Sequence, residues 1–364
     1  MAIIVDDQKL LQFTQKVFET FGVGHQQAFI CAENLVLADL RGIPSHGVAR
    51  LQRYVNGMKN GTILPLAKPV VVKDTLSTAT VDANSGLGQV AGHFSTQLAI
   101  DKAQRTGVGI VTVRNSNHYG IAGYYSLMIL NAGMMGISMT NSAPLVVPTF
   151  GKEMIIGTNP ISLTAPTKRN RPFFLDMATS VVPRGKLEVY ERLEKSMPEG
   201  WAVNAMGKIT TSASEVLKNM TARAGGGILP LGGEGELFSG YKGYGMAVLV
   251  DILCGVLSGG AYTDKVDSKG PMGQAQPAEV AHFFMALKIE NFVDMDVFTD
   301  KMDDLIDRLK NSQKADGATR IYIHGEKEYE LFDKHQKDGL PLEEKVFENL
   351  QKIAADRGVL FDIQ

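Results

Sequence analysis

Cysteine is almost absent from this chain, which has two, Cys31 and Cys254, among its 364 residues. Both lie in apolar, helix-like stretches, so we expect two buried core residues and neither a disulfide framework nor a metal site. A secretory signal is also missing, because the N-terminus MAIIVDDQKL turns acidic after four apolar residues. Together these features predict a cytoplasmic protein in a reducing compartment.

An excess of either charge is absent as well, since 37 Lys and Arg against 39 Asp and Glu give a net charge of −2. No overall field therefore attracts nucleic acid or an anionic membrane. The most apolar run, GMAVLVDILCGVLSGGAY, is broken by Asp251 and by glycines, which favours a buried helix over a membrane span. The motifs HExxH, CxxC, Walker A and GxSxG do not occur, so zinc hydrolysis, nucleotide triphosphate hydrolysis and esterase chemistry have no support and no metal is expected.

The spacing of apolar residues divides the chain into a helical part, residues 1–70, and an α/β part, residues 71–294. In the second part short β-rich runs alternate with helix-like runs, which predicts a layered α/β domain. Within it, residues 183–220 are expected to be mixed and mainly helical. Helices at about residues 295–364 are expected to pack with the N-terminal part. The expected strands lie at residues 70–72, 80–82, 109–113, 136–139, 161–164 and 173–176.

In the stretch RGIPSHGVARLQRYVNGMKNG, Pro44 and Ser45 mark the start of a predicted amphipathic helix, with Ser45 as the candidate N-cap. In such a helix His46 and Arg50, four residues apart, lie on the same face. On geometry alone, a surface histidine above a solvated arginine is the commoner outcome. A histidine and an arginine that share a binding site is the alternative.

A dinucleotide signal of the Rossmann type is present but does not fit. Strand-like text leads into Gly86, Gly88 and Gly92, but the third glycine comes one residue too late. The next strand ends in Arg114, where an NAD-binding acid is usual. We therefore predict that any nicotinamide nucleotide is bound without a Rossmann fold.

A second histidine, His118, follows strand-like text in VRNSNHYG. Its neighbours Asn115, Ser116 and Asn117 could fix its tautomer, which would suit a histidine that exchanges protons. A structural histidine that binds turn carbonyls is equally compatible with this pattern.

Polar residues also follow several other expected strands. Thr140 with Asn141, and Thr158 with Asn159, could bind an amide or a ribose, or could form Asx-turns.

Further on, Asp176 precedes Thr179, Ser180 and Arg184, which could hold a ribose and a pyrophosphate or could cap a helix. Glycine-rich GGGILPLGG and GYKGYG supply backbone N–H groups for phosphate or for close packing. Two histidines, an arginine and these loops suit hydride transfer to a 2-oxo acid, with the arginine on the carboxylate and a histidine on the carbonyl oxygen.

At this point the sequence resembles the malate/L-lactate dehydrogenase family that is unrelated to the Rossmann-type malate and lactate dehydrogenases. The resemblance covers roughly residues 5–345. It rests on five stretches in order: ADLRGIPSHGVARLQRYV, RNSNHYGIAGYYS, TNSAPLVVPTFGKEMIIGTNPISLTAPT, FFLDMATSVVPRGK and PLGGEGELFSGYKGYGMAVLVDILCGVLSG. The resemblance implies a homodimer with a helical part and an α/β part, a mixed sheet, and a nicotinamide site that is not a Rossmann fold.

The resemblance also implies roles for individual residues. His46 matches the proton donor of some members and His118 the base of others, while Ser45 and Arg50 match substrate-binding positions. Members of the family usually have the segment R-I-P-G-E late in the chain. The corresponding segment here reads RIYIHGE, with His324 in place of the proline. Implied cofactor contacts are Asn141, Ser142, Asp176, Met177, Ala178, Thr179, Ser180, Pro230, Leu231, Gly232, Gly325 and Glu326.

The reaction expected from the resemblance is hydride transfer between NAD, with NADP as the alternative, and a 2-hydroxy acid, most simply malate. Another 2-oxo acid, a cyclic imine, or a cofactor-binding homologue without turnover are the alternatives. Arg53, Lys152 and Arg184 are candidates for a second substrate carboxylate, and the sequence does not rank them.

Overall fold

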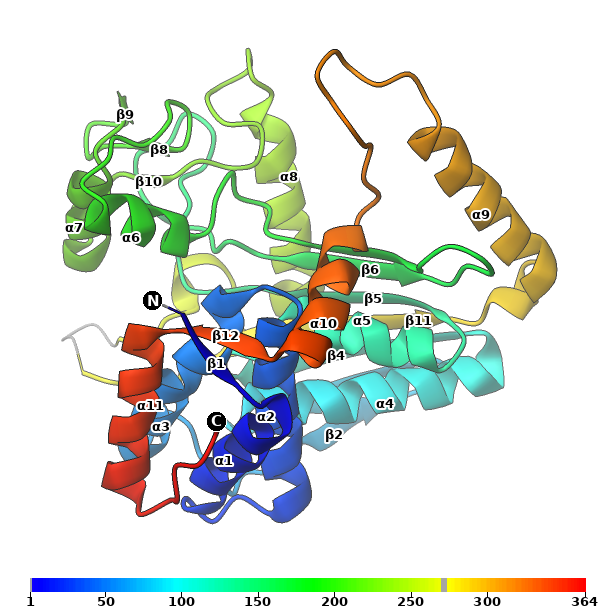
Figure 1. Cartoon of the computed structure of the whole chain (residues 1–364), viewed down its shortest axis with the longest axis horizontal. Helices are drawn as coiled ribbons and strands as arrows, with labels where there is room; N and C mark the ends of the chain where they lie inside the picture. Colours follow the sequence, from blue (N-terminus) through cyan, green and yellow to red (C-terminus); the bar gives the residue numbers. More distant parts are fainter. Residues whose placement is uncertain (1, 270–273) are drawn as a thin grey trace.

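The computed structural model describes residues 2–269 and 274–364, and a seven-stranded sheet lies at its centre (Figure 1). The strand order is β2-β3-β4-β11-β5-β6-β7, in which β3 pairs parallel with β4 and the other neighbours pair antiparallel. A Rossmann sheet is mostly parallel, so this mixed sheet is not of that type. The strands are β2 (Val70–Asp74), β3 (Thr78–Asp82), β4 (Val108–Ser116), β5 (Met135–Thr140), β6 (Ile161–Ala165), β7 (Phe173–Met177) and β11 (Val280–Leu287).

The six strands predicted from the sequence are confirmed, with ends that differ by a few residues. The central strand β11 was not predicted. It follows β7 by about a hundred residues of chain and pairs with both β4 and β5, placing His282 opposite Val113 and Thr140. Its residues are buried along most of its length, as expected of a strand flanked by others and covered on both faces.

Helices cover both faces of the sheet. On one face α4 (Gly88–Thr106) and α5 (Ala122–Asn131) pack against β4 and β5. α4 approaches β4 so closely that a Cβ on Gly109 would collide with the Ala99 carbonyl. The other face carries α8 (Gly240–Asp251), which continues into a π-helical turn that packs on β4 and β11. The sequence predicted a buried helix here, but α8 is buried on one side only, and Leu249 on its other side is exposed.

A second hydrophobic core lies among helices from both ends of the chain, at the lower left of Figure 1. Cys31 is buried in it, and Cys254 is buried under the sheet, so both thiols are core residues as expected. The elements around this second core are α1 (Asp7–Glu19), α2 (His25–Leu40), α3 (Leu51–Lys59), α10 (Glu326–Asp338), α11 (Glu344–Arg357), β1 (Ala2–Val5) and β12 (Leu340–Glu343). The division of the chain into two domains near residue 70 stays a prediction.

A third cluster of short elements stands at the upper left of Figure 1. It contains the mixed region expected after residue 183, with two helices and a small three-stranded sheet. The elements of this cluster are α6 (Arg184–Arg192), β8 (Ala202–Val203), β9 (Ile209–Thr210), α7 (Ala213–Ala222) and β10 (Gly227–Ile228).

Within the described residues, no helix is both long and apolar enough to cross a membrane.

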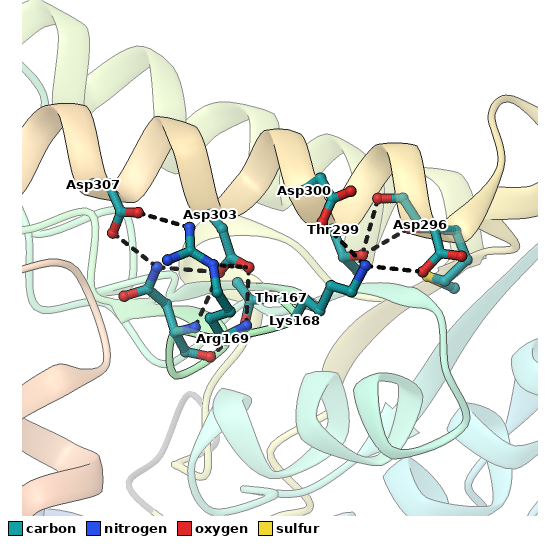
Figure 2. Close-up of polar contacts among 10 residues, drawn as sticks. Thr167, Lys168, Arg169, Asp296, Thr299, Asp300, Asp303 and Asp307 are labelled. Atoms are coloured by element: carbon teal, nitrogen blue, oxygen red, sulfur yellow. Dashed lines mark hydrogen bonds and ion pairs between the residues drawn. The ribbon is translucent and has the colours of Figure 1, made fainter.

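α9 (Met295–Lys310) stands at the right edge of Figure 1 and contacts the β6–β7 loop through polar groups. Figure 2 shows Asp303 and Asp307 of α9 facing that loop. The buried Asp303 carboxylate accepts hydrogen bonds from the backbone N–H groups of Arg169 and Asn170, at 2.9 and 3.0 Å. These bonds hold the middle of α9 against the β6–β7 loop.

The predicted helix beginning at Ser45 is wrong in its first turns. Pro44–His46 and Val48–Arg50 are two separate 3₁₀ turns, and Ser45 caps neither of them. The interruption arises because the buried Asp39 carboxylate accepts the N–H of Val48 at 2.7 Å. A Cβ on Gly47 would collide with that carboxylate, so a glycine is required there. His46 and Arg50 are therefore brought together by a turn and not by one continuous helix face.

Candidate active site

His46 and His118 meet in a cavity of about 450 Å³ whose wall also includes Ser45 and Arg50. Their rings stack with centroids 5.5 Å apart and planes 19° apart. His46 comes from the 3₁₀ turns after α2, and His118 from the end of β4. The cavity thus joins the N-terminal helices to the carboxyl end of a central strand.

The ring of His118 is held through its Nδ1 atom. Tyr54 of α3 lies 2.6 Å from this nitrogen, and the backbone N–H of Gly120 donates to it at 3.3 Å. Because a backbone N–H cannot accept a hydrogen bond, Nδ1 carries no proton, and the neutral ring carries its proton on Nε2. His118 is therefore suited to donate a hydrogen bond from Nε2.

The ring of His46 contacts a hydroxyl group, which does not fix the position of the ring proton. Its Nδ1 lies 3.0 Å from the hydroxyl of Ser45, which can either donate or accept a hydrogen bond. Nε2 of His46 can consequently gain or lose a proton while Nδ1 stays satisfied. Arg50 is anchored next to it, because its Nε donates to the Ser45 carbonyl at 2.5 Å.

Both histidines are neutral at neutral pH. Exclusion of water and the charges of Arg50 and Arg53 lower the pKa of His46 to about 4. Exclusion of water, then Arg53, His46 and Arg50, hold the pKa of His118 well below its usual range. A neutral imidazole is the form that can accept a proton from a hydroxyl group.

The three candidates for a second carboxylate fall in two places. Arg53 and Arg184 line the cavity that contains the two histidines. Lys152 lines a separate, neighbouring cavity of about 820 Å³ together with Arg223.

Asn141 and Ser142 lie in the wall of the histidine cavity, as the resemblance implied, but their side chains bind the protein. The Asn141 amide donates to the Ala261 carbonyl at 2.9 Å and accepts the N–H of Ala281 at 2.8 Å. The Ser142 hydroxyl accepts the N–H of Thr158 at 3.1 Å. These two residues shape the wall at the end of β5.

Asp176, Met177 and Gly325 line a further cavity, of about 400 Å³, between β7 and the start of α10. Gly325 has a φ of +94°, and a Cβ there would collide with the Cβ of Phe174. One oxygen of the Asp176 carboxylate accepts the N–H of Gly123 at 2.8 Å. Burial raises the pKa of Asp176 to about 7.

The residues after Asp176 lead from this cavity toward the histidine cavity. The Thr179 hydroxyl donates to the carbonyls of Thr158 and Asn159, each at 3.1 Å. The Ser180 hydroxyl donates to the Val182 carbonyl at 3.0 Å. Both hydroxyls are thus satisfied by the protein, while Thr158 itself lines the histidine cavity.

Three further predicted cofactor positions belong to the adjoining loop. Pro230 pairs with Ser180, and the N–H of Leu231 donates to the Thr179 carbonyl at 2.8 Å. Gly232 lines another cavity, which also includes Val181. The loop is therefore packed on the segment after β7 that carries Ala178 to Ser180.

Glu326 is not among the residues that line the cavity of Asp176. Its carboxylate pairs with Lys310 and with Arg320, the latter at 3.1 Å, and accepts the N–H of Ile323 at 3.1 Å. His324, which stands where the family usually has proline, lines that cavity beside Gly325. Glu326 holds the loop that presents His324 and Gly325.

Three functional neighbours were missed from the sequence. For Tyr54 one signal was available, because a phenol that is buried needs a hydrogen-bond partner. Asp39 gave no local signal. His282 is buried between Thr140 and Ser116, at 2.7 and 2.8 Å, and so joins the ends of the two strands that carry the cavity wall.

The chain is similar to known proteins over nearly its whole length. The family model for malate/L-lactate dehydrogenase matches residues 5–351. A malate dehydrogenase of Pyrococcus horikoshii is 51% identical over 357 residues, 98% of this chain and 96% of the relative. An L-sulfolactate dehydrogenase of Methanocaldococcus jannaschii is 38% identical over 94% of each chain. The crystal structure of malate dehydrogenase from Entamoeba histolytica superposes with a TM-score of 0.95 at 34% identity over 100% of both chains.

The chain is thus an oxidoreductase with a mixed α/β fold. It belongs to the malate/L-lactate dehydrogenase family. Membership implies a nicotinamide cofactor.

Proposed function

We propose that this protein is a malate dehydrogenase that transfers a hydride between NAD and the C2 atom of malate or oxaloacetate. The stacked pair of His46 and His118 beside Arg50, in one cavity, is the observation that carries the proposal. The 51% identity to a malate dehydrogenase over nearly the whole chain supports the choice of substrate.

Each residue of the pair has its own task in this proposal. Arg50 binds the C1 carboxylate through the guanidinium N–H groups that Ser45 leaves free. His46 takes the proton from the C2 hydroxyl of malate at Nε2, and returns it in the reverse direction. His118 donates a hydrogen bond from Nε2 to the same oxygen, which stabilises the charge that develops there.

The cavity lined by Asp176 and Gly325 fits the ribose part of a nicotinamide cofactor. Asp176 has one oxygen bonded to Gly123, so the other can accept a ribose hydroxyl. Glu328 lines the same cavity, and two carboxyl groups favour a free 2′-hydroxyl over a 2′-phosphate, which supports NAD over NADP. When bound, the nicotinamide would supply or accept the hydride. Ser142, Thr179 and the loop at Gly232 would form the wall between ribose and substrate.

We also propose that the protein is a homodimer located in the cytoplasm. An apolar stripe on α8 and the turn after it stays exposed, with Leu249, Ile252 and Val256 at 46, 50 and 54%. A stripe at this spacing is typical of a helix that packs against a partner. Sedimentation velocity should give one species of twice the chain mass, and a species of the chain mass alone would contradict the dimer.

The function is tested by initial rates with NADH and NADPH against oxaloacetate, pyruvate, 2-oxoglutarate, 3-sulfopyruvate and a cyclic imine. We expect the highest kcat/KM for oxaloacetate and a lower KM for NADH than for NADPH. A higher kcat/KM for another acid would contradict the assignment of malate and oxaloacetate as substrates. Turnover of the imine alone would show that the protein is an imine reductase and not a 2-hydroxy acid dehydrogenase.

A further inference from the structure

The histidine cavity carries more positive charge than one carboxylate can balance. Arg50 and Arg53 both line it, and neither makes an ion pair with any of the described residues. The two histidines are neutral at pH 7 because their pKa values are lowered. A 2-oxo acid with one carboxylate would leave one guanidinium uncompensated, whereas a dicarboxylate would balance both.

Arg50 and Arg53 line the same cavity as the histidine pair. Arg50 ends the second 3₁₀ turn and Arg53 lies in the first turn of α3, so they are three residues apart on successive turns. Among charged neighbours, Arg50 lowers the pKa of His46 most, and Arg53 lowers that of His118 most. Each arginine therefore acts most strongly on a different ring of the pair.

The other two candidates are less suited to a second carboxylate. Arg184 lines the cavity, but its Nε already donates to Glu188 at 2.9 Å. Lys152 lies in a different cavity. Arg53, by contrast, forms no hydrogen bond or ion pair with the part of the chain that the structure describes, although it lines the cavity.

We propose that Arg53 binds the second carboxylate of a four-carbon substrate and so sets the preference for malate and oxaloacetate over lactate and pyruvate. This inference rests on the proposed 2-hydroxy acid dehydrogenase function. Arg50 holds the carboxylate next to the reacting carbon, which both kinds of substrate have, and Arg53 holds the one that only the dicarboxylates have.

Arg53→Met, Arg53→Lys and Lys152→Met, each compared with the wild type, test the inference. In Arg53→Met we expect kcat/KM for oxaloacetate to fall by about 50-fold or more, as for loss of a charge-assisted pair, while the value for pyruvate changes less than about threefold. Arg53→Lys should retain part of the preference because it keeps the charge. Lys152→Met, outside the cavity, should leave both values unchanged.

Inhibition constants give an independent readout for the same variants. Tartronate, with two carboxylates, should inhibit Arg53→Met more weakly than the wild type, whereas oxamate, with one, should inhibit both alike and so show that the site is folded. An equal loss for both substrates and both inhibitors would overturn the assignment of Arg53, as would an unchanged preference for oxaloacetate. Wild-type protein that reduces no oxo acid would instead overturn the proposed function, and the inference with it.

Discussion

His46→Ala should lower kcat for malate oxidation by about 10²- to 10⁴-fold, the usual contribution of a positioned acid or base. The reason is that Nε2 of His46 can change its protonation state, because the Ser45 hydroxyl at Nδ1 either donates or accepts. His118 lacks this freedom, since the Gly120 N–H fixes its Nδ1 as an acceptor. His118→Ala should therefore cost less in kcat, about 10- to 100-fold, as loss of a donor to the substrate oxygen.

The pH dependence separates the two histidines. The pKa of His46 is about 4 in the free protein, so the basic form needed for malate oxidation predominates above that pH. The protonated form needed for oxaloacetate reduction declines as pH rises, and the reduction rate should fall from pH 5 to pH 8. This slope should persist in His118→Ala and disappear in His46→Ala. The reverse pattern in kcat and in slope would make His118 the acid and base.

Arg50→Met should remove about 2–4 kcal/mol of transition-state stabilisation. kcat/KM should therefore fall roughly 30- to 700-fold for oxaloacetate and for pyruvate alike. The loss is common to both because the C1 carboxylate is common to both. It should appear chiefly as a higher KM, since the carboxylate is bound equally in the ground state and the transition state. Removal of the Arg50 charge should also move the pKa of His46 upward, because that charge lowers it.

Arg50→Lys is the matched control for this prediction. A lysine keeps the charge but loses the planar fork that binds a carboxylate through two parallel hydrogen bonds. We expect an intermediate loss, measured by initial rates at saturating NADH. If Arg50→Met leaves kcat/KM unchanged for both acids, the carboxylate is bound elsewhere.

Local sequence patterns predicted much of the fold. Six strands and the helices between them were found because apolar spacing along a short segment reflects its own burial. The central strand β11 escaped because its partners β4 and β5 are more than a hundred residues away in the chain. Pairing over that distance leaves no trace in the spacing of the eight residues concerned.

The candidate site, like the fold, could be predicted from the sequence only in part. His46, His118 and Arg50 belong to motifs that can be recognised one by one, and the structure brings them into one cavity. Their orientation depends on buried groups from other segments. Asp39 replaces the expected helix start by two short turns, and Tyr54 holds the His118 ring. Glu326 was expected at the cofactor and instead pairs with Lys310 and Arg320; its cofactor role stays a prediction.

The central claim is direct hydride transfer between a nicotinamide and C2 of a four-carbon 2-hydroxy acid. We would test it with NADH that carries deuterium at C4 of the nicotinamide, in the 4R or the 4S position, and with oxaloacetate as acceptor. Mass spectrometry of the product should show malate with one deuterium at C2 from one of the two labelled cofactors. Malate without deuterium from either cofactor, or no malate at all, would contradict the account.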